Sequence, residues 1–256
     1  MFWKERILLV IALFVIGTSD STNTSNSEDQ KVTVRFYGEA QCPFCRKFVT
    51  EVWQPIWSDL ELRKFIDYDF IPWGNAYFAT EKCGSGPYSA QERGCWYQNC
   101  IESSNDSDEC FAGEVVYQHG LKEGQTDIYE SCVKDLFGLE DAVAFTHCVE
   151  GPNMDHIIDA EALMRKCLVK TQDANIIQDC LEKRGRDIEI SNAKQTPTHP
   201  GVPYVIVDGD PVDDMMKIKE IICKTLENKN GVDPFPKACQ DRNTSPQSRL
   251  RVVRCI

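Results

Sequence analysis

Two cysteines three residues apart, Cys42 and Cys45, form the strongest chemical signal in the sequence. The apolar residues that follow recur at helical spacing, so the pair lies at the start of a helix. A helix N-terminus stabilises a thiolate, and a second thiol one turn later can resolve a mixed disulfide. The pair therefore predicts thiol–disulfide exchange, with Cys42 as the attacking, more exposed thiolate and Cys45 as the resolving thiol. The basic Arg46 and Lys47 also favour the thiolate.

A static disulfide and a zinc site are the alternatives for this pair. A disulfide between residues i and i+3 closes a very short loop and stabilises little. Structural zinc requires four ligands, and no second CxxC or CxxH pair exists at a suitable spacing, since Cys95 and Cys100 are five apart. We therefore expect no metal here.

The segments around the pair predict a strand, a helix and a second strand. Residues 32–37 alternate in polarity, 43–64 have helical spacing, and 68–73 form a second apolar run. This order favours two parallel strands joined by a right-handed crossover. Residues 80–113, with four cysteines, are interpreted as a disulfide-stapled loop, and 125–184 as mostly helical.

The chain then returns to the pattern of the first segments. A short strand is expected at 204–207, a turn at 208–209 and an amphipathic helix at 211–227. The whole predicts an α/β, thioredoxin-like domain over 31–227, with a helical, disulfide-stapled insertion at about 77–196 between the second strand and the third. In that architecture the proline before the third strand is cis and lies beside the CxxC pair. We therefore expect a cis bond between Val202 and Pro203, and a substrate-binding role for both residues. An ordinary trans proline at a strand start is the alternative.

The two ends of the chain indicate the secretory pathway. Residues 1–19 have the basic, apolar and small-residue regions of a signal peptide, and 20–30 are interpreted as a flexible leader. No later apolar run approaches the roughly 20 residues that span a bilayer, so no membrane association is expected. Residues 228–256 are predicted to be a tail, stapled back by a disulfide. Sequons at Asn23, Asn105 and Asn243 predict glycosylation.

Charge and cysteine content support the same setting. The net charge of −12 disfavours nucleic-acid partners. Thirteen cysteines are typical of an oxidising compartment. If Cys42 and Cys45 form the working pair, eleven remain, so at least one is free or intermolecular, which leaves a disulfide-linked dimer open.

Several motifs in order resemble the gamma-interferon-inducible lysosomal thiol reductase family. The matching pieces run over about 31–255. They are 36–38 (FYG), 42–45 (CPFC), 72–76 (PWGNA), 118–120 (QHG), Glu123, Cys132, 148–150 (CVE), 203–209 (PYVIVDG) and the late cysteines 167, 180, 223, 239 and 255. The family's signature has two more cysteines, at positions held here by Tyr117 and Gly124. Their joint loss is expected if they pair with each other in relatives.

The resemblance implies reduction of disulfide bonds in protein substrates at acidic pH, in a lysosome or outside the cell. It implies small thiols as the reductant, no cofactor, and trimming at both ends. A thiol with an ordinary pKa near 8.5 is almost fully protonated at about pH 5, so Cys42 requires a strongly lowered pKa. A non-catalytic secreted binding protein and a disulfide oxidase or isomerase are the alternatives.

The histidines leave their roles open. His119 either contacts the substrate or satisfies a buried hydrogen bond. His199, near the expected cis proline, either approaches Cys42 or is a solvated loop residue.

Overall fold

A computed structural model describes residues 31–103, 107–151, 156–157, 159–168, 173–229, 235–240 and 254–256. The expected signal peptide and leader, the three sequons and most of the tail lie outside the described residues. None of the described helices is both long enough and apolar enough to cross a membrane.

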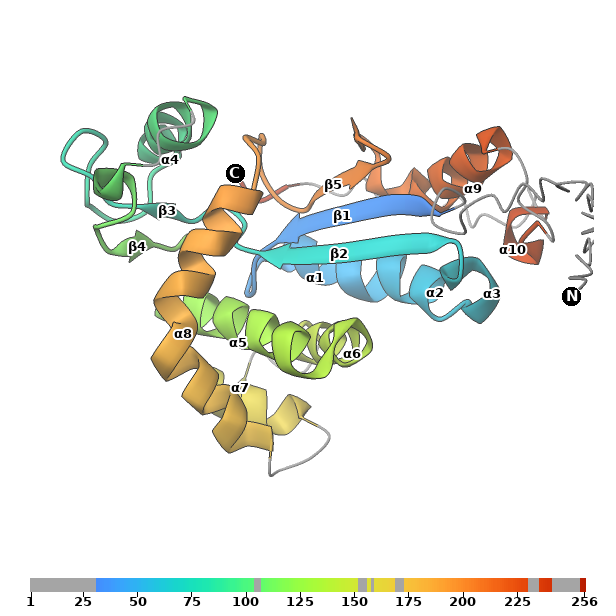
Figure 1. Ribbon diagram of the computed structural model, residues 1–256, viewed down its shortest axis with the longest axis horizontal. Helices are drawn as coiled ribbons and strands as arrows, with labels where there is room; N and C mark the ends of the chain where they lie inside the picture. Colours follow the sequence, from blue (N-terminus) through green and yellow to red (C-terminus); the bar gives the residue numbers. More distant parts are fainter. Residues whose placement is uncertain are drawn as a thin grey trace, which may run out of the picture.

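A four-stranded sheet lies at the centre of the molecule (Figure 1). Its order is β2 (Ile66–Pro72), β1 (Val32–Gly38), β5 (Tyr204–Val207) and β6 (Asp210–Pro211). The central strand β1 pairs in parallel with β2, as the strand–helix–strand order predicts, and it pairs antiparallel with β5. The apolar side chains that alternate along β1 are fully buried, so the alternation in the sequence correctly predicts which face of the strand packs against the core.

The helix after β1 is interrupted twice. α1 (Pro43–Lys47) continues through a π-helical segment (Phe48–Trp53) into α2 (Gln54–Trp57), and a separate turn, α3 (Leu60–Arg63), follows. The prediction of one helix over 43–64 is therefore wrong near residue 58. The Asp59 side chain accepts the backbone N–H groups of Glu61 and Leu62 and starts a new helix there.

The cysteine-rich insertion contains a helix that the sequence did not reveal. β3 (Tyr77–Phe78) pairs with β4 (Val115–Val116), and between them lie α4 (Ala90–Trp96), a π-helical segment (Tyr97–Glu102) and a 3-10 turn (Asp108–Cys110). Disulfides Cys83–Cys95 and Cys100–Cys110 staple it internally. The helical spacing is hard to see because this short helix buries Arg93 and Trp96 rather than an apolar stripe.

Four helices form a second, smaller hydrophobic core. They are α5 (Leu121–Phe137), α6 (Leu139–Val149), α7 (Ala160–Cys167) and α8 (Asp173–Gln195). Disulfides Cys132–Cys180 and Cys148–Cys167 cross this core. The helical prediction for 125–184 is confirmed for most of the described residues in that range.

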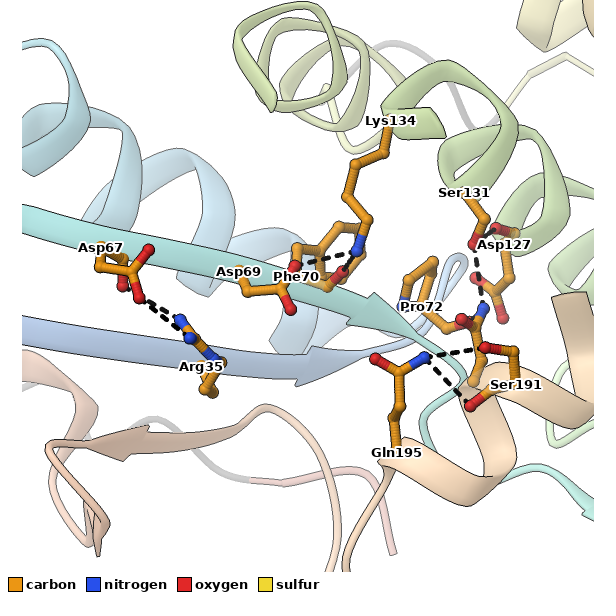
Figure 2. A network of polar contacts seen from close by, with 11 residues as sticks. Arg35, Asp67, Asp69, Phe70, Pro72, Asp127, Ser131, Lys134, Ser191 and Gln195 are labelled. Atoms are coloured by element: carbon orange, nitrogen blue, oxygen red, sulfur yellow. Dashed lines mark hydrogen bonds and ion pairs between the residues drawn. The ribbon is translucent and has the colours of Figure 1, made fainter. Parts of the chain in front are cut away.

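Polar contacts fix this helical block against the edge strand β2. Figure 2 shows Lys134 of α5 reaching Asp69 and the Phe70 carbonyl, at 2.9 and 2.8 Å. The buried Asn192 of α8 donates to the Pro72 carbonyl and to the Ser131 hydroxyl, both at 2.9 Å. Since β2 ends at Pro72, these bonds hold α5 and α8 beside the end of the sheet that carries the CxxC pair.

The chain closes with a short 3-10 turn (Met215–Lys217), α9 (Ile218–Asn228) and α10 (Lys237–Gln240). The helix predicted from residue 211 begins later, because Pro211 pairs in β6 and Asp214 caps the turn that follows. Cys223–Cys239 staples α10 to α9, so this part of the tail is held by a disulfide as expected.

Candidate active site

Cys42 occupies the N-cap of α1, directly after the turn that leaves β1. Gln41 adopts a positive φ of 69°, and Cys42 itself is extended. The Cys42 sulfur accepts the backbone N–H of Cys45 at 3.5 Å. The predicted position of Cys42 at a helix N-terminus is thus confirmed.

The bonding of the two cysteines differs from the expected working pair. Cys42 is bonded to Cys255, 213 residues away, and Cys45 is the unpaired thiol. Both are buried, at 0% and 1% exposure, so the expectation that Cys42 is the more exposed is wrong. Six disulfides account for the other twelve cysteines, and this arrangement leaves no exposed thiol for a disulfide-linked dimer.

The bond between Val202 and Pro203 is cis, as predicted. Val202 and Cys255 form an antiparallel bridge: the Cys255 N–H donates to the Val202 carbonyl at 2.7 Å, and the Val202 N–H donates to the Cys255 carbonyl at 3.0 Å. Gly201, with φ of 153°, permits this approach, because a Cβ there would lie 2.2 Å from the Cys255 oxygen. The residue before the cis proline therefore contacts the segment bonded to Cys42.

Two side-chain amides lie on the same side of the site. The Asn75 amide donates to the Cys255 carbonyl at 3.2 Å, and the Gln118 amide donates to the Ile256 backbone oxygen at 2.9 Å. These residues belong to the PWGNA and QHG motifs, to which the sequence assigned no contact.

The other side of the site is a cluster of buried carboxyl groups. Five are no more than 3% exposed: Glu39, Glu123, Asp127, Glu130 and Glu150. Asp127 accepts the Ala40 N–H at 2.8 Å, and Glu39 accepts the Asn75 N–H at 2.6 Å. Sequence reasoning missed this cluster, although the spacing of 123, 127 and 130 puts three acids on one face of α5.

Burial governs the protonation of these groups. It raises the pKa of Glu123, Asp127 and Glu130 well above the ordinary range, and neighbouring carboxylates raise it further. Burial also raises the pKa of the Cys45 thiol, followed by the negative charge of Glu39. Cys45 is therefore a protonated thiol at rest, and its activation requires a proton acceptor.

Arg46, His119 and His199 differ in their contacts around this site. Arg46 Nε lies 3.8 Å from Glu150, and His119 Nε2 lies 3.3 Å from the buried Glu39. His199 is 5% exposed, stacks on Tyr204 and contacts the Pro197 carbonyl at 2.7 Å. Burial lowers the pKa of His199 to about 4, so the alternative of a solvated loop histidine is wrong.

One group of metal-type ligands lies at the same place. Single atoms of Glu39, Cys42, His119 and Cys255 all lie within 4.8 Å of one another. The two sulfurs are bonded to each other, and zinc binds thiolates, so these four residues are not a ligand set in this redox state.

Tyr117 and Gly124, the two positions at which the resemblance implies lost cysteines, are in contact. The Tyr117 ring lies against Gly124, and a Cβ at residue 124 would come within 2.1 Å of it. Tyr117 also bonds to Glu189 of α8. The bulky ring therefore requires glycine opposite it, and the contact agrees with the hypothesis that both cysteines were lost together.

Comparison with known proteins shows which family the chain resembles. The model of the gamma-interferon-inducible lysosomal thiol reductase (GILT) family matches residues 33–111, which include the CPFC and PWGNA motifs. The mouse protein of that name is 26% identical over 227 residues, covering 84% of this chain and 75% of the relative. The chain therefore resembles GILT proteins over most of its length, and these similarities support thiol–disulfide oxidoreductase activity.

Similarity to proteins with such names extends to plants. The gamma-interferon-responsive lysosomal thiol protein of Arabidopsis thaliana is 22% identical over 228 residues, covering 86% of this chain and 81% of the relative. Among solved structures, oxidised BdbD from Bacillus subtilis has a TM-score of 0.50 at 12% identity and covers 80% of this chain and 89% of its own. The predicted α/β, thioredoxin-like fold with a helical insertion is confirmed.

Proposed function

We propose that this chain reduces disulfide bonds in protein substrates, with Cys42 as the attacking thiolate and Cys45 as the resolving thiol. The observation that carries the proposal is the segment bonded to Cys42. Cys255 is held in an extended conformation, antiparallel to Val202, with its sulfur on the sulfur of Cys42. This is the geometry that a substrate peptide requires in a mixed disulfide with Cys42, and it supports substrate binding along Val202 and Pro203.

The reaction uses two exchanges. The Cys42 thiolate attacks one sulfur of the substrate disulfide, the substrate bond breaks, and the leaving thiolate takes up a proton. Cys45 then loses its proton and attacks the Cys42 sulfur, which forms Cys42–Cys45 and releases the second substrate thiol. Two molecules of a small-thiol reductant restore the dithiol and become a disulfide.

The buried carboxyl groups support proton transfer at Cys45. The charges of Glu39, Glu150 and Asp127 all act on its thiol. Burial raises the pKa of Asp127, and a carboxyl group with a raised pKa is better suited to accept a proton from Cys45 and to return it. Because an ionised cluster opposes formation of a Cys45 thiolate, protonation of the cluster in acid lowers that opposition.

We propose an acidic endolysosomal or extracellular setting for this chemistry. The names of the mouse and Arabidopsis relatives describe lysosomal proteins, and buried acids with raised pKa values favour a folded state at low pH. In the bonded form, Cys42 becomes available when small thiols reduce Cys42–Cys255, or when Cys45 displaces Cys255 and small thiols then reduce the resulting Cys42–Cys45 bond.

Reduction of insulin at about pH 5 and pH 7 tests the function, with the turbidity of the released B chain as the readout. Cys42→Ser is expected to abolish the reaction, whereas the control Cys223→Ser with Cys239→Ser removes a structural disulfide and keeps the active pair. Activity that survives Cys42→Ser and disappears in Cys255→Ser would give the attacking role to the tail. A wild-type protein that forms insulin disulfides under the same conditions would indicate an oxidase.

A further inference from the structure

The segment Arg254–Ile256 lies in the site as a short extended peptide. Its cysteine bonds to Cys42, and its backbone pairs with Val202 in both directions. The contacts around it therefore show which groups of the protein face the backbone of a peptide whose cysteine has reacted with Cys42.

Two backbone oxygens of this peptide accept hydrogen bonds from the side-chain amides of Asn75 and Gln118. The Cys255 carbonyl accepts the Val202 N–H at 3.0 Å and the Asn75 amide at 3.2 Å. The next backbone oxygen, that of Ile256, accepts the Gln118 amide at 2.9 Å. A carbonyl oxygen has two lone pairs, so both donors at Cys255 can be satisfied together.

The orientation of these amides is fixed by their other contacts. Arg93, which only donates, bonds to the Asn75 side-chain oxygen, so the Asn75 nitrogen faces the peptide. That nitrogen also donates to the Gln118 oxygen at 2.7 Å, which turns the Gln118 nitrogen toward Ile256. Arg93 is itself held by the His199 carbonyl at 3.0 Å.

The contacts made by side chains of the peptide differ from the contacts made by its backbone. Ile256 is 69% exposed and fills no pocket, so the residue after the cysteine is recognised through its backbone. Arg254, before the cysteine, donates to the Val212 carbonyl at 3.2 Å and lies over the Tyr204 ring at 6.0 Å. This position can accept a basic side chain.

We propose that Asn75 and Gln118 bind the substrate's backbone, at the carbonyls of the target cysteine and of the residue after it, and that Arg254–Ile256 is an internal occupant of this site. This inference rests on the proposed attack by Cys42. The substrate class is an extended peptide with any residue after the cysteine and a basic residue favoured before it.

A kinetic comparison in the Cys255→Ser protein, in which the tail no longer bonds to Cys42, tests the proposal. The probe is the peptide Arg-Val-Val-Arg-Cys-Ile-Gly-Gly carrying thionitrobenzoate on its cysteine, and the reference is the small disulfide DTNB. Gln118→Ala is expected to raise KM for the peptide about 5- to 10-fold with kcat retained, because one hydrogen bond of about 1 kcal/mol is lost. Reduction of DTNB should not change.

Matched variants keep the result interpretable. Gln195→Ala removes an exposed glutamine that bonds only within α8 to Ser191 (Figure 2), and it should leave both reactions unchanged. Asn75→Ala should have the same effect on KM as Gln118→Ala. Because Asn75 is fully buried, its replacement can prevent folding, and in that case the Gln118→Ala result alone tests the proposal.

An unchanged peptide KM in Gln118→Ala, or an equal loss with peptide and DTNB, would overturn the inference. Failure of the proposed function has a different signature, because Cys42→Ser would then still reduce DTNB.

Discussion

The two sides of the Cys42–Cys45 pair differ in the chemistry of their side chains. On the side of the cis proline, the groups that contact the bound segment are neutral donors: the Val202 N–H and the amides of Asn75 and Gln118. On the side of α5, the neighbours of Cys45 are buried carboxyl groups, with Asp127 and Glu39 nearest to the turn that carries the pair.

This difference separates two tasks. Amides and backbone groups do not titrate, so they can hold a peptide equally well at neutral and acidic pH. Carboxyl groups can gain and lose a proton, and burial raises the pKa values of Glu123, Asp127 and Glu130. Glu39 connects the sides, since it accepts the Asn75 N–H and lies beside His119. Gly74, with φ of 57°, permits the close packing, because a Cβ there would lie 2.2 Å from the Glu39 carboxylate.

The largest expected effect is on stability as a function of pH. Glu123, Asp127 and Glu130 have folded-state pKa values above their unfolded ones, so the folded state binds more protons. Their contribution is fully present below about pH 4 and is lost as the pH rises through the folded-state values. Urea unfolding should therefore give a larger free energy of unfolding at about pH 5 than at pH 7.5. His199 opposes this trend, since its lowered pKa costs stability as the pH falls from 6.5 toward 4.

The Glu130→Gln variant distinguishes the contribution of the buried acids to the pH dependence of stability from the contribution of the negatively charged surface. It should raise stability at pH 7.5 by about 1–3 kcal/mol and change it little in acid, because a buried charge is replaced by a neutral amide. The control Glu61→Gln changes a glutamate that is 64% exposed and should shift stability by less than about 0.5 kcal/mol. A wild-type protein more stable at pH 7.5, together with a destabilised Glu130→Gln, would contradict the account of the acid side.

A smaller effect is expected on the Cys45 thiol. In the Cys42→Ser, Cys255→Ser protein the other ten cysteines are paired, so Cys45 is the sole thiol and its thiolate absorbance near 240 nm reports its titration. Asp127→Asn should lower the pKa of Cys45, because one nearby negative charge is removed while an oxygen remains for the Ala40 N–H. The control Asp67→Asn alters an exposed β2 residue that bonds to Arg35 (Figure 2). It should leave the pKa of Cys45 unchanged. An equal shift in both variants would remove the specific role of Asp127.

The smallest effect concerns the junction between the two sides. Tyr117→Cys combined with Gly124→Cys should form a disulfide, because the two positions are in contact just before and within the first turn of α5. Reductase activity should change by less than about twofold, since neither residue contacts the bound segment. Mass spectrometry of the non-reduced peptides decides this, and two free thiols at 117 and 124 would count against a shared disulfide in the relatives.

The sequence was sufficient to predict three of the four strands of the central sheet, the helix start at Cys42 and the cis bond before Pro203. These features depend on local signals: alternation in β1, a CxxC pair before helical spacing, and a proline ahead of an apolar run. The helix break at Asp59 and the helix α4 were missed, because capping and contacts between short segments outweighed the apolar period there.

The surroundings of the site depend on contacts between distant segments. The partner of Cys42 comes from residue 255, and spacing alone gives no means of choosing among thirteen cysteines. The acid cluster combines residues from the turn after β1 with residues of α5 and α6, so only the spacing of 123, 127 and 130 was visible beforehand. The roles of Asn75 and Gln118 likewise required the position of the tail.

Trapping of a substrate on the attacking cysteine tests the central claim most directly. In Cys45→Ser, Cys255→Ser protein the resolving thiol and the competing tail cysteine are absent, so a substrate disulfide attacked at about pH 5 should remain bonded to the enzyme. We predict that peptide mapping finds this mixed disulfide on Cys42. A protein that forms no adduct, or forms it on another cysteine, while the Cys255→Ser protein reduces the same substrate, would contradict attack by Cys42.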